Sequence, residues 1–131
     1  MAGSKTNYFE DGVLNIIKGT NFTGITARVA LYTALTDGEA STVTEVANSN
    51  NYARTAVTFG SLSGGSMSNS AKCTFPTPSG SWGTVVGWGV VDSATHGAGN
   101  ILYYSDQTPN KAINSGDVVE FDIGALVLTE T

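Results

Sequence analysis

One segment of this sequence reads Asn51-Tyr52-Ala53-Arg54-Thr55-Ala56-Val57-Thr58-Phe59 and alternates between the two faces of an extended chain. It leads through a run of small residues, Gly60-Ser61-Leu62-Ser63-Gly64-Gly65-Ser66, into a second extended stretch that ends at Phe75. An alternating run, a turn of small residues and a second extended run are typical of antiparallel β pairing. The segment therefore predicts a chain built from antiparallel strands.

The same pattern continues on both sides of this segment. Side chains alternate with a period of two from Ile25 to Leu35, which predicts a half-buried strand. The most apolar stretch, Trp82 to Asp92, contains glycines and predicts a strand that is buried on both faces or bent by a bulge. Further strands are expected at 42–46, 101–104, 118–123 and 126–129. With turns roughly every ten residues, residues 25–131 are predicted to form a compact antiparallel β-sandwich of jelly-roll type, and residues 1–131 a single all-β domain.

The N-terminal part differs, because its apolar residues recur at helical spacing. The residues with this spacing are Tyr8, Phe9, Val13, Leu14, Ile16 and Ile17. Glu10-Asp11 near the start and Lys18-Gly19 at the end suit the two termini of a helix. We expect a short amphipathic helix over residues 6–18, which either caps an open end of the sandwich or docks against a neighbouring subunit. Residues 1–7 are polar and unpatterned, and we expect them to form a flexible arm.

Composition and charge exclude two classes of partner. The 131 residues carry a formal net charge of -5, and the six Lys and Arg residues are scattered. Because no basic patch could neutralise several phosphates, we expect neither nucleic-acid binding nor attachment to a membrane surface. No apolar run approaches the ~20 residues that cross a bilayer, and no secretion signal is visible, so we expect folding in the cytoplasm.

No catalytic residue, cofactor site or metal site is predicted. The single histidine, His96, lies in an expected loop and is interpreted as solvated, and a small hydrolase that uses His96 is the alternative we rank last. Cys73, the only cysteine, is interpreted as a small buried hydrophobic residue. Asp117, Glu120 and Asp122 form the densest acidic group, which is interpreted as a solvated strand face, although an ion there is left open.

Trp82 and Arg54 are candidates for contact with a partner. Trp82 follows a turn rich in Pro, Gly and Ser and is the better candidate for exposure, whereas Trp88 is assigned to the core. Arg54 can form a bidentate ion pair, either with another subunit or across strands of its own chain. The sequence does not choose between these partners. A cross-strand pair on the surface would contribute less than ~1 kcal/mol.

Short motifs in this order resemble a family of small tailed-phage virion proteins, labelled tail-fibre or capsid-decoration proteins. The motifs are Asn7-Tyr8-Phe9-Glu10 to Leu14, Val29-Ala30-Leu31-Tyr32-Thr33, Thr44-Glu45-Val46, Tyr52-Ala53-Arg54 to Phe59, Ser68-Asn69-Ser70-Ala71, Thr74-Phe75-Pro76, Trp82-Gly83-Thr84-Val85, Ile101-Leu102-Tyr103 and Asn114-Ser115-Gly116-Asp117.

The resemblance implies a non-enzymatic structural component of a virion that is made in the host cytoplasm. We expect a capsid-decoration (cement) protein, because a fibre shaft would show repeats. Its partners would be the major capsid protein or other virion proteins, and the chain would form a homo-oligomer with no cofactor. Tyr8, Phe9, Arg54 and Trp82 are the residues expected to bind partners. The alternative is a tail-fibre or tail-tip module that binds a host receptor or glycan, with Trp82, Tyr103 or Tyr104 exposed in a groove.

Overall fold

The computed structural model describes residues 2–20 and 24–130, with only the backbone of residues 2, 108 and 109. One helix, α1 (Asn7–Ile17), follows the first strand. The strands of the described chain are β1 (Ala2–Lys5), β2 (Arg28–Asp37), β3 (Thr42–Glu45), β4 (Thr55–Ala56), β5 (Ser66–Ser68), β6 (Cys73–Thr74), β7 (Gly83–Val91), β8 (Ile101–Ile113), β9 (Glu120–Phe121) and β10 (Val127–Thr129).

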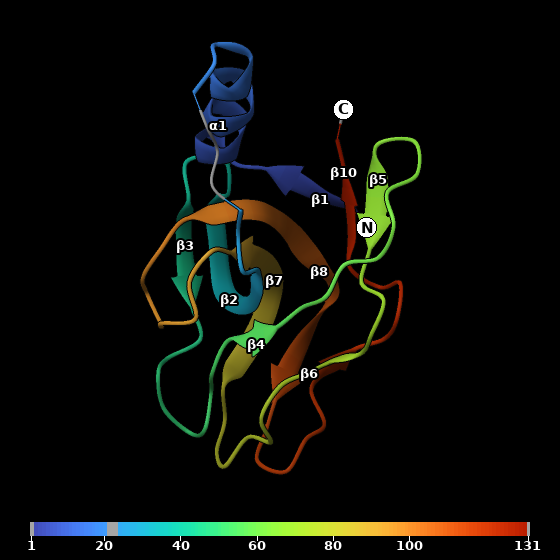
Figure 1. Cartoon of the computed structure of the whole chain (residues 1–131). Coiled ribbons are helices and arrows are strands. Elements are labelled where there is room, and N and C mark those ends of the chain that lie inside the picture. Colours follow the sequence, from blue (N-terminus) through green and yellow to red (C-terminus); the bar gives the residue numbers. More distant parts are fainter. Residues whose placement is uncertain (1, 21–23, 131) are drawn as a thin grey trace.

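Most of these strands belong to one large sheet. Its order is β3-β2-β7-β8-β1-β10-β5, with β4 also paired to β2, and β6 and β9 form a separate two-stranded sheet. Figure 1 shows β2, β7 and β8 in the body of the molecule and α1 projecting from one end. The prediction of an all-β fold with one short N-terminal helix is confirmed. The strands divide unequally between the two sheets, and the pair β1–β10 is parallel.

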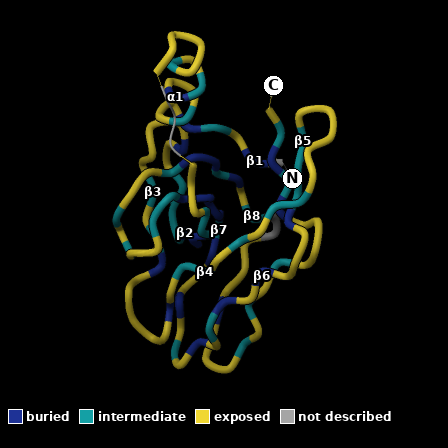
Figure 2. Tube along the Cα trace, in the orientation of Figure 1, coloured by how far each residue is buried: buried dark blue, intermediate teal, exposed yellow. Residues whose placement is uncertain are grey.

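The central strands are buried on both faces. In β2, Val29 and Leu31 belong to the main core, whereas Ala30 and Tyr32 pack on the opposite face with Val91. The prediction that this strand is half-buried is wrong, because partly buried side chains cover its second face. The side chains that do so are Leu35, Val43 and Ile101. In Figure 2 the buried segments gather around β2, β7 and β8, while the projecting helix is largely exposed.

Strand β7 has the form that its glycines predict. Its C-terminal half is buried on both faces, and its pairing with β8 shifts register between Val85 and Gly87. Strand β7 is therefore both buried on two faces and interrupted by a bulge, the two forms that the sequence left open. Pairing continues beyond the bulge, and β8 runs on to Ile113, well beyond the expected strand at residues 101–104.

Gly89 is required by a close approach between β7 and β2. A Cβ atom at this position would lie 2.3 Å from the hydroxyl oxygen and 2.7 Å from the ring of Tyr32, a residue that is 1% exposed. Gly89→Ala is therefore expected to lower the free energy of unfolding by about 1–3 kcal/mol, as overpacking does. Urea denaturation measures this. Gly24→Ala is the control, since its Cβ meets nothing within 4 Å, and equal stability of the two variants would contradict the packing described.

Residues 2–5 form a strand, so the prediction of a flexible arm over residues 1–7 is wrong for this segment. Gly3 pairs with Leu128 of β10, and Ser4 pairs with Tyr104 of β8. Strand β1 therefore joins the β10–β5 ribbon to the rest of the sheet. Next to it, the buried Thr6 caps α1 by accepting a hydrogen bond from the Phe9 N–H. This strand is held by backbone pairing and contains the small Gly3. Its sequence therefore shows no alternation of apolar and polar side chains from which a strand could be predicted.

The segment from residue 51 to residue 75 pairs with itself as its sequence predicts, although its regular strands are short. The Gly60 N–H donates to Ser68 O (2.8 Å), and Ser70 N–H donates to Thr58 O (2.9 Å), around the bridge from Phe59 to Asn69. The expected strand at 118–123 is likewise reduced to β9. These segments cross over the main sheet as irregular extended chain and close its core.

Candidate functional site

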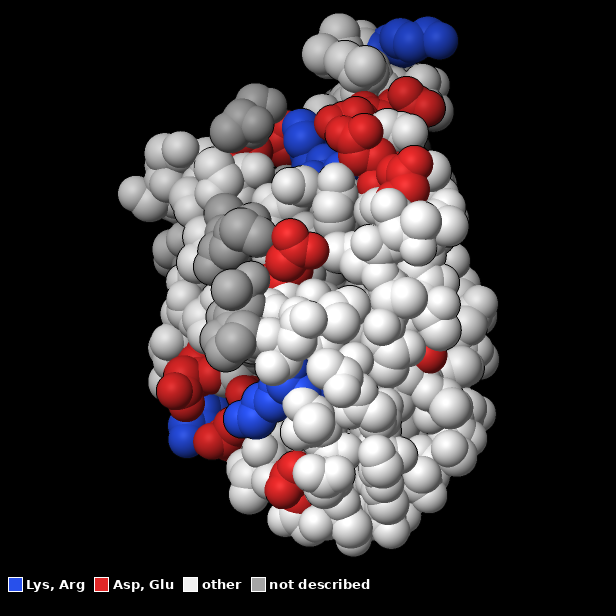
Figure 3. Space-filling model, turned by 180° about the vertical axis from the view of Figure 1, so that it is seen from behind, with Lys and Arg blue, Asp and Glu red and all other residues white. Residues whose placement is uncertain are grey.

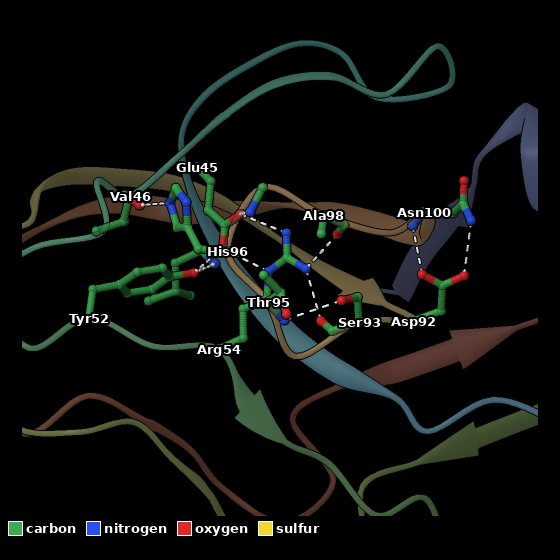
Figure 4. Close-up of polar contacts among 12 residues, drawn as sticks. Glu45, Val46, Tyr52, Arg54, Asp92, Ser93, Thr95, His96, Ala98 and Asn100 are labelled. Atoms are coloured by element: carbon green, nitrogen blue, oxygen red, sulfur yellow. Dashed lines mark hydrogen bonds and ion pairs between the residues drawn. The ribbon is translucent and has the colours of Figure 1, made fainter.

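Glu45 and Arg54 form a buried ion pair that fastens two loops (Figure 4). Arg54 Nη2 donates to Glu45 Oε1 (2.8 Å) and Arg54 Nε donates to Glu45 Oε2 (2.9 Å), and both side chains are at most 9% exposed. Arg54 Nη1 donates to the carbonyls of Ser93 and Ala98. The pair is therefore intramolecular. It closes the loop between β3 and β4 and holds the loop between β7 and β8 against it.

Tyr52 and His96 extend this network. The Tyr52 hydroxyl donates to Glu45 Oε2 (2.7 Å), and the ring of His96 meets the Tyr52 ring edge-on at 6.0 Å. His96 Nε2 donates to Val46 O (2.8 Å), because a carbonyl oxygen can only accept. His96 is thus half-buried and packed, not solvated as expected. Among the described residues no serine or cysteine side chain is hydrogen-bonded to the His96 ring, and this ring ties the loop after β7 to the backbone at Val46.

The charge of Glu45 is favoured by its neighbours. Burial alone would raise the pKa of this carboxyl, but hydrogen bonds from Arg54 and Tyr52 and the positive guanidinium lower it below the ordinary value. A carboxylate held ionised in this way does not serve as a general acid near neutral pH.

Trp82 is buried, so the expectation of its exposure is wrong. Its side chain is 4% exposed, its Nε1–H donates to Asn50 O (2.8 Å), and its ring packs edge-on against Tyr52 and Phe75. The carbonyl of Asn50 that binds the indole also accepts from the Ser79 N–H of the preceding turn (3.1 Å), which ties this turn to the chain at Asn50. Trp82 therefore has little surface to offer a partner, and its binding role stays an untested prediction.

The other predicted residues lie at the projecting helix and its base. Tyr8 is exposed on α1, and Phe9 is half-buried with its ring 5.5 Å from that of Tyr103. Tyr103 is buried and its hydroxyl donates to Glu130 Oε2, while Tyr104 lies half-buried against Gly38. Neither tyrosine is among the residues that line the two hollows of about 540 and 470 Å³ in the described part of the chain. The structure therefore separates Tyr8 and Phe9 from Arg54 and Trp82.

A hollow of about 540 Å³, which we call the β8–β9 groove, lies between β8 and the segment that leads into β9. Its floor is apolar, and its rim carries polar side chains together with the exposed Val118. The floor consists of Leu31, Val85, Trp88, Ile113 and Phe121, and the rim carries Asp106, Gln107, Lys111, Asp117 and Glu120. These residues come from four separate parts of the chain. Apart from the bulge expected in β7, no pattern in the sequence predicted that these residues would lie together.

Two of the three acidic residues of the groove, Asp117 and Glu120, have partners of their own. Glu120 lies 3.3 Å from Lys72 Nζ, which also approaches Asp122, and Asp117 accepts from the Asn114 N–H (2.8 Å). Across residues 2–20 and 24–130, no three His, Cys, Asp or Glu side chains are arranged to hold a metal ion. Seen from behind in Figure 3, acidic and basic groups lie beside one another and wide areas carry no charge.

Two comparisons with known proteins bear on this chain. The model of a protein family described as Podophage GP4 fiber I protein gp80 matches residues 4–129. A search among curated proteins found no match. The matched range runs from the end of β1 through β10 and contains both the β8–β9 groove and α1. No helix in the described chain is both long enough and apolar enough to cross a membrane.

Proposed function

Since this chain belongs to the podophage GP4 fiber I protein gp80 family, we propose that it is a non-enzymatic tail-fibre protein whose β8–β9 groove contacts the host surface. The match over residues 4–129 is the observation that carries the fibre role, and it confirms the resemblance to tailed-phage virion proteins. The family description names a fibre. The capsid-decoration role that the sequence favoured is not confirmed, so the tail-fibre alternative becomes the main proposal.

The chemistry of the groove supports contact with a carbohydrate. A pyranose ring has an apolar face, which packs on aromatic and aliphatic side chains, and hydroxyl groups at its edge, which need hydrogen-bond partners. The groove supplies the half-buried Phe121 and the exposed Val118 for the first requirement, and Asp106, Gln107 and Lys111 for the second. An apolar floor with a few polar groups around it is the usual form of a small-molecule site. Saccharides of the bacterial surface are therefore the ligands proposed.

The groove is tested by competition for host cells. Purified protein is expected to slow adsorption of the phage to the bacterium it infects. Asp106→Ala removes a carboxylate acceptor from the rim and is expected to raise the concentration needed for half-inhibition about tenfold, the cost of one charged hydrogen bond. Ala125→Trp, a substitution at an exposed position that lines the groove, is expected to abolish inhibition by filling it.

Glu39→Ala is the matched control, since Glu39 is an exposed carboxylate outside the groove. It should inhibit adsorption as well as the unchanged protein does. If Ala125→Trp still competes fully, the groove is not the contact surface. If the unchanged protein does not slow adsorption at all, the host-contact proposal itself is refuted.

A further inference from the structure

A second hollow, of about 470 Å³, lies on the other face of strand β2 from the β8–β9 groove. Neighbouring residues of a strand point to opposite faces, and in β2 Leu31 lines the groove whereas Tyr32 lines this hollow. Its walls are formed by β3, by the Glu45–Arg54 pair and by the loop that follows β7, which Figure 4 shows around Arg54. We call it the Tyr32 hollow. Its volume falls within the range of about 300–1,000 Å³ that is usual for sites of small ligands.

The hydroxyl of Tyr32 is buried at this hollow without a hydrogen-bond partner among the described residues. Tyr32 is 1% exposed, and its hydroxyl lies over Gly89 of β7, where the sheet forms the floor. Glu45 does not accept from it, because both carboxylate oxygens already accept from Arg54 and one of them also accepts from Tyr52. A buried donor that is left unpaired destabilises the fold. A bound molecule that brings an acceptor to this hydroxyl would remove that cost.

We propose that the Tyr32 hollow binds a neutral sugar residue, with the Tyr32 hydroxyl donating a hydrogen bond to an oxygen of the sugar. Burial, and after it the charge of Glu45, raises the pKa of Tyr32, so the hydroxyl keeps its proton and acts as a donor. The half-buried Val43 and Ile101 offer apolar surface to one face of the sugar ring.

The rim of the Tyr32 hollow supplies further hydrogen-bonding groups for the edge of a sugar. Ser41 and Thr44 line the hollow and are exposed. A hydroxyl group can both donate and accept, so these side chains can bond to sugar hydroxyls in either sense. The Tyr32 hollow therefore combines one buried donor, an apolar wall and an adaptable polar rim.

The charges at the Tyr32 hollow are balanced, which favours an uncharged ligand. Glu45 and Arg54 neutralise each other, and Arg54 Nη1 is bound to the carbonyls of Ser93 and Ala98. A charged sugar would lose hydration in the hollow without gaining an unpaired counter-charge. Neutral sugars should therefore bind more tightly than glucuronate or glucosamine. The proposal does not depend on host contact through the β8–β9 groove, because the two hollows lie on different faces of β2.

Amide chemical shifts of the isotope-labelled full-length chain, followed by nuclear magnetic resonance, test the site. The probes are D-glucose, D-galactose, L-rhamnose and N-acetyl-D-glucosamine, with glucuronate and glucosamine as charged counterparts. The titration uses Ala125→Trp, in which the β8–β9 groove is filled and does not contribute. At millimolar concentrations a neutral probe is expected to shift the amide signals of Val43, Gly97 and Gly99, which line the Tyr32 hollow.

Two results of this titration would overturn the proposal. One is the absence of shifts at the Tyr32 hollow with every neutral probe, and the other is tighter binding of glucuronate or glucosamine than of the neutral sugars. Neither result bears on the competition for host cells, which tests the β8–β9 groove alone. Failure of one site is therefore distinguishable from failure of the other.

Tyr32→Phe separates a hydroxyl that serves a ligand from one that serves the fold. It is expected to weaken sugar binding about tenfold, the loss of one hydrogen bond. The variant should be at least as stable to urea as the unchanged protein, because no hydrogen bond within the described chain is lost.

Tyr103→Phe is the matched control, since Tyr103 is also buried but lines neither hollow, and its hydroxyl donates to Glu130 Oε2 (3.2 Å). It should bind sugar as the unchanged protein does and unfold at a lower urea concentration. Unchanged sugar affinity in Tyr32→Phe would overturn the proposal. A loss of stability in Tyr32→Phe as large as that in Tyr103→Phe would do so too, because the Tyr32 hydroxyl would then have its partner within the fold.

Discussion

Arg54→Met is expected to lower the free energy of unfolding by about 3–5 kcal/mol, because it leaves the Glu45 carboxylate buried without its partner. This is several times the value of less than ~1 kcal/mol for an exposed ion pair. The difference rests on burial, since the two side chains are only 5% and 9% exposed. Arg54 also holds the carbonyls of Ser93 and Ala98, so both loops should loosen together. Urea denaturation of the two proteins measures the effect.

A double-mutant cycle separates the ion pair from the packing around it. Glu45→Gln leaves the guanidinium unpaired and should also destabilise the protein. The Glu45→Gln/Arg54→Met double variant should be less destabilised than the sum of the two single variants, because neither charge is then left alone. Strictly additive effects, or a loss below ~1 kcal/mol for Arg54→Met, would contradict a buried, coupled pair.

The same pair predicts how stability depends on pH. The pKa of Glu45 is lowered in the folded chain from its ordinary value of 4.5. A lowered carboxyl pKa contributes stability that is fully present above the unfolded value and is lost as the pH falls through the folded value. The difference in unfolding free energy between the unchanged protein and Glu45→Gln should therefore be constant near neutral pH and shrink below about pH 4.5.

Trp82→Ala is expected to cost about 3–5 kcal/mol of stability, the usual range for removing a large aromatic side chain from a core. Its ring meets those of Tyr52 and Phe75 at 5.2 and 6.4 Å, so a cavity would open between the main sheet and the segments that cross it. Trp82→Phe should cost less, since it keeps most of the ring but loses the hydrogen bond to Asn50 O. Thermal unfolding followed by circular dichroism ranks the two variants.

Leu62→Ala is the control for Trp82, because Leu62 is a large apolar residue that is 74% exposed. Its effect should stay within about 0.5 kcal/mol. If Trp82→Ala proves as mild as Leu62→Ala, the ring is exposed, and the interpretation of Trp82 as a surface residue is restored.

The strands with strong alternation or strong apolar character could be predicted from the sequence. Both the bulged strand β7 and the self-pairing of residues 51–75 follow from the spacing of glycines and apolar residues. Strand β1 could not be predicted in this way. Its residues are held by backbone bonds to β8 and β10, strands that lie about a hundred residues or more further along the chain. Such pairing leaves no local pattern.

Side-chain environments were harder to predict than strands. Trp82 is flanked by Ser81 and Gly83, which favour exposure locally, yet the chain at Asn50 covers it. From the sequence, Arg54 could have paired with a carboxylate of its own chain or of another subunit. It pairs with Glu45 of its own chain because β3, β4 and the loop after β7 lie together in the fold. The β8–β9 groove was harder still to predict. Trp88 and Lys111 lie in strands β7 and β8, which pair in the main sheet, whereas Glu120 belongs to the separate β6–β9 sheet.

The place of this chain in the virion tests the account most directly. Cryo-electron microscopy of intact particles that carry the protein should show its density on the tail. The β8–β9 groove should then face outward from the particle. Density spread over the icosahedral shell would contradict the tail-fibre role and restore capsid decoration as the function.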